Sequence, residues 1–267
     1  MIPRELGSLK LKRGQLTITG PALRQLIDGY ARDAGVRNLE KQIRRIARKS
    51  AVKIVEDSSL PIRVGPESLE ELLGKRVFAG EQMFHAPRPG VVRGLAWTNM
   101  GGDTLCIEAL PIRAGQPGFK QTGQLGKVMI ESSDIAYTFV RSLCSQDNGC
   151  RDFFEQHLIH LHVPAGATPK DGPSAGITMA AALYTLAHNR PIAASFAMTG
   201  ELTLTGHVMP VGGIKEKMIA ARRAKVKHVV LPIGNQGDFE SLPEHVKKGL
   251  RPHFVAEFRQ VIDLCLS

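Results

Sequence analysis

The stretch Pro169-Lys170-Asp171-Gly172-Pro173-Ser174-Ala175-Gly176-Ile177-Thr178 places one serine among small residues, where a loop leads into an apolar segment. Pro173 suits the first turn of a helix, because the N–H group that proline lacks has no helical partner there. Residues 175–186 are apolar on nearly every side, which is typical of a buried helix. Ser174 is therefore predicted at the N-terminal end of a core helix.

The position of Ser174 favours negative charge. The free N–H groups at a helix N-terminus stabilise an alkoxide or a tetrahedral oxyanion, so a nucleophilic serine would be well placed here. The alternative is structural: Ser174 is an ordinary N-cap residue, or Asp171 or Gly172 caps the same helix.

A second segment, residues 214–224, contains a lysine that is predicted to lie on the apolar side of a helix. A helical wheel at 3.6 residues per turn puts Lys217 in an apolar arc and Lys215 on the polar side; the arc also holds Ile214, Met218, Ala220, Ala221 and Ala224. Burial of an amine lowers its pKa from about 10.4 towards the range of about 7–8 that suits a general base. The alternative is a side chain that lies along the apolar face with its amine in water.

Together these motifs resemble the proteolytic domain of the ATP-dependent Lon protease family. The resemblance extends from about residue 93 to the end of the chain. Its matching segments are residues 94–98, 101–103, 122–126, 160–164, 167–176, 198–201 and 210–217.

The resemblance implies roles for named residues. Ser174 matches the nucleophile and Lys217, rather than Lys215, the general base; Thr199 matches a threonine that holds the lysine amine. Asp171 matches a residue beside this dyad, where it would pair with the lysine in a resting state; a helix cap is its alternative. The backbone N–H groups of Ser174 and Ala175 are expected to form the oxyanion hole.

Substrate binding is expected next to the serine. The extended segment 198–208, beginning at Met198, would offer an edge to which an unfolded substrate adds as a strand. Pockets near Trp97 and Pro173 would favour apolar side chains, although Trp97 fits the core equally well. Trp97, Pro173 and Met198 are the predicted substrate groove.

A different serine hydrolase class also fits one motif. Residues 172–176 satisfy G-x-S-x-G, the nucleophile elbow of α/β-hydrolases, and Asp238 with His245 or His253 follows in the order of a triad. That elbow needs a strand ending directly before the serine, whereas the nearest predicted strand, residues 158–163, stops about ten residues earlier. The α/β-hydrolase alternative is therefore disfavoured.

The net charge of +10 is concentrated at the N-terminal end. Residues 1–76 carry 16 Lys and Arg against 9 Asp and Glu, and six of the basic residues lie on one predicted helix: Lys41, Arg44, Arg45, Arg48, Lys49 and Lys53. Such a face can contact phosphates of DNA, although most charged helix faces are simply solvated.

Residues 30–40 resemble the lid subdomain of the Lon AAA+ ATPase module, in which Arg37 matches the nucleotide-sensing arginine. The chain has no G-x-x-x-x-G-K-[ST] loop to cradle phosphates, so we expect no ATP hydrolysis by this chain. ATP and Mg²⁺ are expected to serve the full-length protein, and no cofactor is expected for peptide cleavage here. We interpret the chain as the C-terminal part of a longer protease; a natural short protein is the alternative.

The expected fold class is α+β. Residues 1–76 are predicted to form a small all-α lid subdomain with extended pieces at 16–18 and 62–64, residues 77–92 a linker rich in proline and glycine, and residues 93–267 a mixed α+β proteolytic domain. In that domain we expect strands at 105–108, 158–163 and 229–231, and helices at 125–144, near 239–250 and at 255–266.

Four cysteines show no CxxC pair and no histidine at metal spacing, so no metal site is proposed. Cys144 and Cys150 are close enough to bridge across a turn, but reduced thiols are expected in a cytosolic chain. No apolar run reaches the roughly 18 residues of a membrane span, and no signal peptide follows Met1, so a soluble, cytoplasmic protein is expected.

The sequence therefore predicts a serine endopeptidase with a Ser-Lys dyad that degrades unfolded or damaged proteins without the ATP-hydrolysing core. The resemblance implies a homo-hexamer. The alternative is a basic module that binds DNA or a partner subunit and carries a non-functional dyad.

Overall fold

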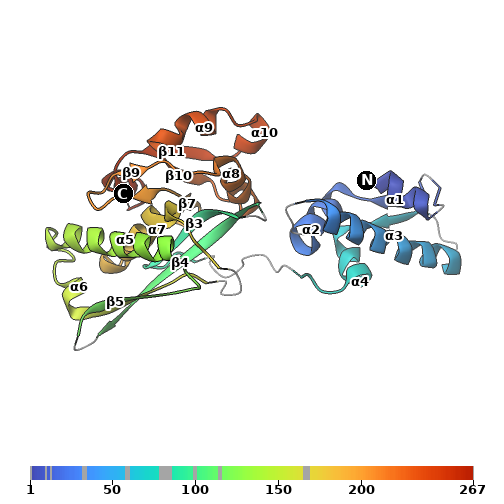
Figure 1. The fold of residues 1–267 in the computed structure, drawn as a ribbon. Helices are drawn as coiled ribbons and strands as arrows, with labels where there is room; N and C mark the ends of the chain where they lie inside the picture. The colour runs from blue at the N-terminus through green and yellow to red at the C-terminus, as the bar shows by residue number, and fades with distance from the viewer. Residues whose placement is uncertain are drawn as a thin grey trace. The chain divides into compact units, whose positions relative to one another are not determined.

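The computed structural model describes residues 2–9, 11–12, 14–31, 35–57, 61–77, 86–98, 101–113, 116–164 and 169–266 (Figure 1). The chain divides into two compact units, residues 1–83 with 99–101, and residues 84–98 with 102–267. Much of the linker predicted at 77–92 lies outside the described residues, and its last two residues, Val91 and Val92, already belong to a strand.

The first unit contains four helices in its described part: α1 (Ile2–Ser8), α2 (Gly20–Tyr30), α3 (Arg37–Asp57) and α4 (Leu69–Leu73), with a 3₁₀ turn η1 (Pro66–Ser68). The two predicted extended pieces, β1 (Leu16–Ile18) and β2 (Ile62–Val64), pair in parallel. Apolar side chains from all of these elements except η1 form one core, whose most buried members include Leu26, Ile46 and Leu69.

The basic helix is α3, as predicted. Two of its six cations have acidic partners: Arg44 makes a bidentate ion pair with the buried Glu5, at 2.6 and 3.1 Å, and Lys53 pairs with Glu71. The Arg44 guanidinium lowers the pKa of the Glu5 carboxyl. The positive face of α3 is therefore partly neutralised by its own subdomain.

The second unit is built on a seven-stranded sheet of order β11-β10-β7-β3-β4-β6-β5. Its strands are β3 (Val91–Thr98), β4 (Gly101–Arg113), β5 (Gly118–Thr122), β6 (His157–His162), β7 (Phe196–Met198), β10 (His228–Pro232) and β11 (Arg251–Val255). The β3, β7, β10 and β11 strands are parallel, whereas β4 and β6 are antiparallel. A separate antiparallel pair consists of β8 (Glu201–Leu202) and β9 (Val208–Met209).

Helices cover both faces of this sheet (Figure 1). One core cluster combines side chains of α5 (Lys127–Ser145), α7 (Gly176–Ala187) and α11 (Phe258–Leu266) with Met198 and Val230. The other combines α8 (Ile214–Arg223), α9 (Gln236–Glu240) and α10 (Glu244–Lys247) with Ala197 and Val229. Because successive strand residues point to opposite faces, neighbours on β7 and β10 serve different cores.

Three predictions for the second unit need correction. The single helix expected near 239–250 is two short helices, α9 and α10, because Pro243 interrupts it. The helix expected from Val255 begins at Phe258, and Val255 ends strand β11. Cys144 and Cys150 form a disulfide, where reduced thiols were expected. In the described residues, no helix is long and apolar enough to cross a membrane.

Candidate active site

Ser174 lies in a one-turn 3₁₀ helix, η2 (Pro173–Ala175), directly before α7. The turn starts after Gly172, whose φ of +118° favours glycine. The N-cap residue of α7 is Ala175, and no side chain caps the helix. Gly172 is the N-cap of the turn that begins at Pro173, as the sequence allowed, whereas the N-cap interpretations of Ser174 and Asp171 are wrong, and the half-buried Ser174 hydroxyl is not engaged in capping.

Backbone hydrogen bonds fix the serine turn against the chain that follows β7. The Ser174 carbonyl accepts from the Gly200 N–H at 2.9 Å, and the Gly200 carbonyl accepts from the Ile177 N–H at 3.2 Å. Gly176 permits this approach, because a Cβ there would lie 2.8 Å from the Leu202 nitrogen. Gly200 thus fixes the backbone both at Ser174 and at Ile177, through one hydrogen bond to each.

Lys217 comes from the opposite face of the sheet, in the first turn of α8. Its side chain is 1% exposed, whereas Lys215 is exposed to solvent, so the wheel prediction is confirmed and the snorkelling alternative is wrong. Ile214, Met218 and Ala221 anchor the same face of the helix in the core.

Thr199 joins the lysine to the serine turn. It follows β7 directly, is fully buried, and accepts a hydrogen bond from the Lys217 Nζ at 3.0 Å. Its Oγ1 donates to the Ser174 carbonyl, also at 3.0 Å. Because a hydroxyl has one proton, Thr199 uses it on Ser174 and acts only as an acceptor towards the amine. A neutral Lys217 would then keep its lone pair for another proton.

Burial lowers the pKa of Lys217 from its ordinary 10.5 to about 8. The cause is loss of hydration of the ammonium form, and Lys217 has no ion pair with a carboxylate within the described ranges. About a tenth of the amine is therefore uncharged at pH 7, and about half at pH 8. Among these residues the Ser174 hydroxyl makes no hydrogen bond to the Nζ, and the two groups share Thr199 instead.

Asp171 is exposed and bonds to backbone. Its Oδ1 accepts from the Met129 N–H at 3.0 Å and from the Gly172 N–H at 2.9 Å. Met129 is in the first turn of α5, so Asp171 caps that helix from a distant part of the sequence. Gly126 makes room for it, since a Cβ there would lie 2.3 Å from the Asp171 Cγ. The predicted pairing of Asp171 with Lys217 is not formed in this structure.

The predicted groove residues occupy different environments. Trp97, near the carboxyl end of β3, is 60% exposed and lies over Gly213 at the start of α8, and Pro173 is half-buried. Met198 is fully buried in the core, so its side chain cannot line a groove. Of the predicted segment 198–208, Met198 ends β7, which lies between β3 and β10 and so has no free edge; β8 and β9 in the rest of the segment pair with each other, and a substrate edge there stays a prediction.

The α/β-hydrolase alternative is wrong. Strand β6 ends at His162, far upstream of the serine turn. Asp238 accepts a hydrogen bond from Asn235, and His253 pairs with His228 at 3.0 Å, so the required acid–histidine pair is not formed.

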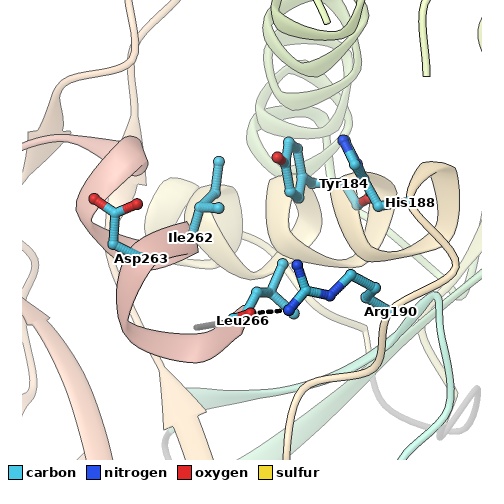
Figure 2. Close-up of a pocket in the computed structure, with 6 residues that line it drawn as sticks. All are labelled: Tyr184, His188, Arg190, Ile262, Asp263 and Leu266. Atoms are coloured by element: carbon cyan, nitrogen blue, oxygen red, sulfur yellow. Dashed lines mark hydrogen bonds between the residues drawn. The ribbon is translucent and has the colours of Figure 1, made fainter. Parts of the chain in front are cut away.

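A cavity of about 280 Å³ lies at the other end of α7, lined by Tyr184, His188, Arg190, Ile262, Asp263 and Leu266 (Figure 2). Neither Ser174 nor Lys217 lines it, and Ser174 lies beyond the opposite end of α7, a helix about 18 Å long for its twelve residues. In the first unit, Arg37 is the exposed first residue of α3.

Ser174 and Lys217 approach each other, on either side of Thr199, where strands of the sheet end. The parallel strands β3, β7 and β10 have their carboxyl ends at one edge of the sheet, and Trp97 and Thr199 lie at that edge. Ser174 reaches it from one face, through the N-terminal end of α7, and Lys217 from the other, through α8. Ligand sites of open α/β sheets are typically found at this kind of edge.

Two models of known protein families match this chain, and both describe domains of one family of peptidases. The Lon protease C-terminal proteolytic domain matches residues 63–267, and the Lon protease AAA+ ATPase lid domain matches residues 8–62. The chain belongs to the Lon protease family.

Individual proteins that resemble this chain are also Lon proteases. Lon protease 1 of Syntrophotalea carbinolica is 51% identical over 267 residues, which cover 100% of this chain and 33% of the relative. The mitochondrial Lon protease homolog of Homo sapiens is 46% identical over 272 residues, covering 99% of this chain and 28% of the relative. The chain thus spans about a third of the length of these relatives.

Proposed function

We propose that this chain is a serine endopeptidase with Ser174 as nucleophile and Lys217 as general base. The observation that carries the proposal is the hydrogen-bonded series Lys217 Nζ, Thr199 Oγ1, Ser174 carbonyl, in which a buried amine of lowered pKa is held beside the serine turn. The peptidase family of the chain supports it.

In the proposed reaction, the neutral Lys217 takes the proton of the Ser174 hydroxyl. The oxygen then attacks a peptide carbonyl and forms an acyl-enzyme, while the lysinium returns a proton to the leaving amine. Water hydrolyses the acyl-enzyme in a second step. The proposal requires a rotamer of Ser174 that brings its hydroxyl to the amine, which Thr199 holds beside the serine turn.

The N–H groups of Ser174 and Ala175 are the proposed oxyanion hole, at the N-terminal end of the apolar helix α7. Trp97 and Pro173 are the proposed walls of the substrate site. Met198 is left out of the groove because its side chain is in the core.

The test compares two lysines of one helix. We expect Ser174→Ala and Lys217→Ala each to reduce cleavage of an unfolded protein by at least about a thousandfold, as removal of a nucleophile or its base does. Lys215→Ala is the matched control, since Lys215 is exposed and two residues away, and it should keep most of the activity. A dead Lys215→Ala variant beside an active Lys217→Ala variant would refute the assignment.

For the full-length protein we propose unfolded or damaged proteins as substrates, assembly as a homo-hexamer, and a nucleotide-sensing role for Arg37 with ATP and Mg²⁺. DNA contact through α3 would rest on Lys41, Arg45, Arg48 and Lys49, because Arg44 and Lys53 are already paired with Glu5 and Glu71. A serine-directed phosphonate separates the enzyme from a basic binding module with a non-functional dyad, because only the enzyme would be labelled at Ser174.

A further inference from the structure

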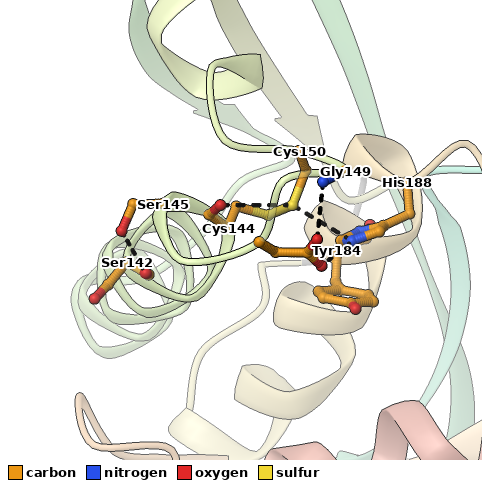
Figure 3. The surroundings of a disulfide bond; sticks show 8 residues. Ser142, Cys144, Ser145, Gly149, Cys150, Tyr184 and His188 are labelled. Carbon is orange, nitrogen blue, oxygen red and sulfur yellow. Dashed lines mark hydrogen bonds and ion pairs between the residues drawn. A yellow bond between two sulfur atoms is a disulfide. The ribbon is translucent and has the colours of Figure 1, made fainter.

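A cluster of sulfur, nitrogen and oxygen atoms lies at the ends of α5 and α7 that are remote from Ser174. Cys144 lies in the last turn of α5 and is fully buried, and Cys150 follows six residues later with 4% exposure. His188, just after α7, comes from 38 residues further along the chain (Figure 3). The two Sγ atoms and a ring nitrogen of His188 all lie within 4.8 Å of one another.

The His188 ring is oriented towards the sulfurs by its other contacts. Its Nδ1 is 3.0 Å from the Tyr184 carbonyl, and its ring stacks on Tyr184 with the centroids 3.9 Å apart. A carbonyl can only accept, so Nδ1 carries a proton. Nε2 is then directed at the Cys150 Sγ, 3.4 Å away. Backbone carbonyls hold the ligating histidines of many metal sites in this way.

Asp147 places a carboxylate beside His188. Its Oδ2 is 2.9 Å from the His188 Nε2, and its Oδ1 accepts from the Gly149 N–H at 2.8 Å. The loop between the two cysteines is thereby folded so that the carboxylate faces the imidazole. A disulfide by itself requires neither of these groups, whereas thiolate, imidazole and carboxylate are the three kinds of side chain that bind zinc.

We propose that the reduced form of this cluster binds a zinc ion through Cys144 Sγ, Cys150 Sγ and His188 Nε2; a shift of the Asp147 side chain, which contacts His188 Nε2, would supply the fourth ligand. Binding replaces the two thiol protons and the Nε2 proton that His188 donates to Asp147: two S–H bonds and one N–H bond break, each of the three atoms forms a bond to the metal, and three protons go to solvent. The disulfide and the metal site are alternative states of the same two sulfurs. A two-electron reductant, such as a phosphine that ends as its oxide, converts the first into the thiols.

The metal would be structural. It would join the C-terminal ends of α5 and α7 and the loop between α5 and α6 (Phe153–Gln156), whereas Ser174 is at the far end of α7. Peptide cleavage would need no metal chemistry, and the proposal does not depend on the catalytic assignment.

The test uses the whole chain, reduced with a phosphine, stripped of metal by a chelator and kept under argon. Titration with Co²⁺ is expected to saturate at one equivalent, with a sulfur-to-cobalt charge-transfer band and the visible bands of tetrahedral cobalt, which Zn²⁺ then abolishes. We expect Cys144→Ser and Cys150→Ser to lose the charge-transfer band. His188→Asn keeps both sulfurs and should bind at least about tenfold more weakly. Cys265→Ser, a cysteine outside the cluster, should bind as the parent does.

A second readout guards against variants that fail to fold. Zinc should raise the melting temperature of the reduced parent and of Cys265→Ser, but not of a folded His188→Asn variant at the same zinc concentration. The proposal is overturned if the reduced parent binds no more Co²⁺ than the Cys144→Ser/Cys150→Ser double variant. Alkylation that shows the two cysteines still joined after phosphine treatment of the native protein would overturn it as well.

Discussion

The burial of Lys217 would set the pH at which its amine acts, if Lys217 is the general base as proposed. Because its pKa is about 8, the ammonium form predominates below that pH and cannot accept the Ser174 proton. We expect kcat/KM for a fluorogenic peptide to rise with pH along a limb centred near pH 8. A limb centred near 6.5, the ordinary pKa of histidine, would point to a different base.

The burial of Lys217 also has a cost in stability. In the folded chain its pKa is about 8, and in the unfolded chain it is near 10.5. Below pH 8 both states are protonated and the cost is fully present; it amounts to about 3 kcal/mol from the difference in pKa. As the pH rises from 8 to 10.5 the folded state loses its proton first, so this cost is progressively relieved.

Lys217→Met should therefore be inactive but more stable. At pH 7 we expect its free energy of unfolding in urea to exceed that of the parent by up to about 3 kcal/mol, and the difference should shrink towards pH 10.5. Lys215→Met is the control; being at an exposed position, it should change stability by less than about 0.5 kcal/mol. A Lys217→Met protein less stable than the parent at pH 7 would contradict this account.

Sequence patterns predicted the burial of Lys217 because a helical wheel needs only local periodicity. The position of Thr199 against both Lys217 and Ser174 rested on family resemblance, since spacing alone does not show which strand end meets which helix. Met198 was misplaced for a related reason: an apolar residue beside a site residue can point to the core, as Met198 does. The capping of α5 by Asp171 could not be predicted from local sequence either, because its partner Met129 is 42 residues away.

At the scale of elements, Asp171 couples the serine loop to helix α5. Replacement by alanine removes the acceptor for the Met129 N–H and should destabilise the chain by about 1 kcal/mol, whereas Asp171→Asn keeps an acceptor and should cost less than about 0.5 kcal/mol. Urea unfolding measures both. The control is Glu131→Ala, which removes an exposed carboxylate that belongs to α5 itself.

The Asp171 variants also test the predicted resting-state pairing. If the charge of Asp171 restrained Lys217, both variants would be more active than the parent and would show a pH limb shifted to lower pH, because the carboxylate favours the ammonium form. From the hydrogen bonds in the structure, we expect Asp171→Asn to keep the activity and pH profile of the parent.

The elements that sequence analysis missed lack a clear local pattern of apolar and polar residues. Strand β11 contains Pro252 and does not alternate, yet an edge strand tolerates proline, and β11 is the edge strand beside β10. The helix expected near 239–250 continued through Pro243 because apolar residues occur on both sides of it. Helices α3, α5, α7 and α8, which are long or strongly apolar, were found with boundaries within a few residues.

For the molecule as a whole, the two compact units and the two family matches divide the chain at different residues. The proteolytic-domain match begins at residue 63, whereas the first compact unit runs to residue 83 and includes β2 and α4. Strand β2 pairs with β1, so residues 62–64 are part of the core of the first unit. Domain boundaries of 1–76 and 93–267 remain a prediction, to be checked by limited proteolysis.

Without a phosphate-binding loop in its sequence, this chain should cleave peptides at the same rate with and without ATP and Mg²⁺. Unfolded proteins should be cut readily and tightly folded ones poorly, because exposure of an extended segment would depend on the spontaneous unfolding of the substrate. The measurement compares a reduced, alkylated protein with its native form, each with and without ATP, and follows phosphate release in parallel. Ser174→Ala serves as the blank for contaminating proteases. Phosphate release by the purified chain, or stimulation of cleavage by ATP, would show that nucleotide chemistry resides in these 267 residues after all.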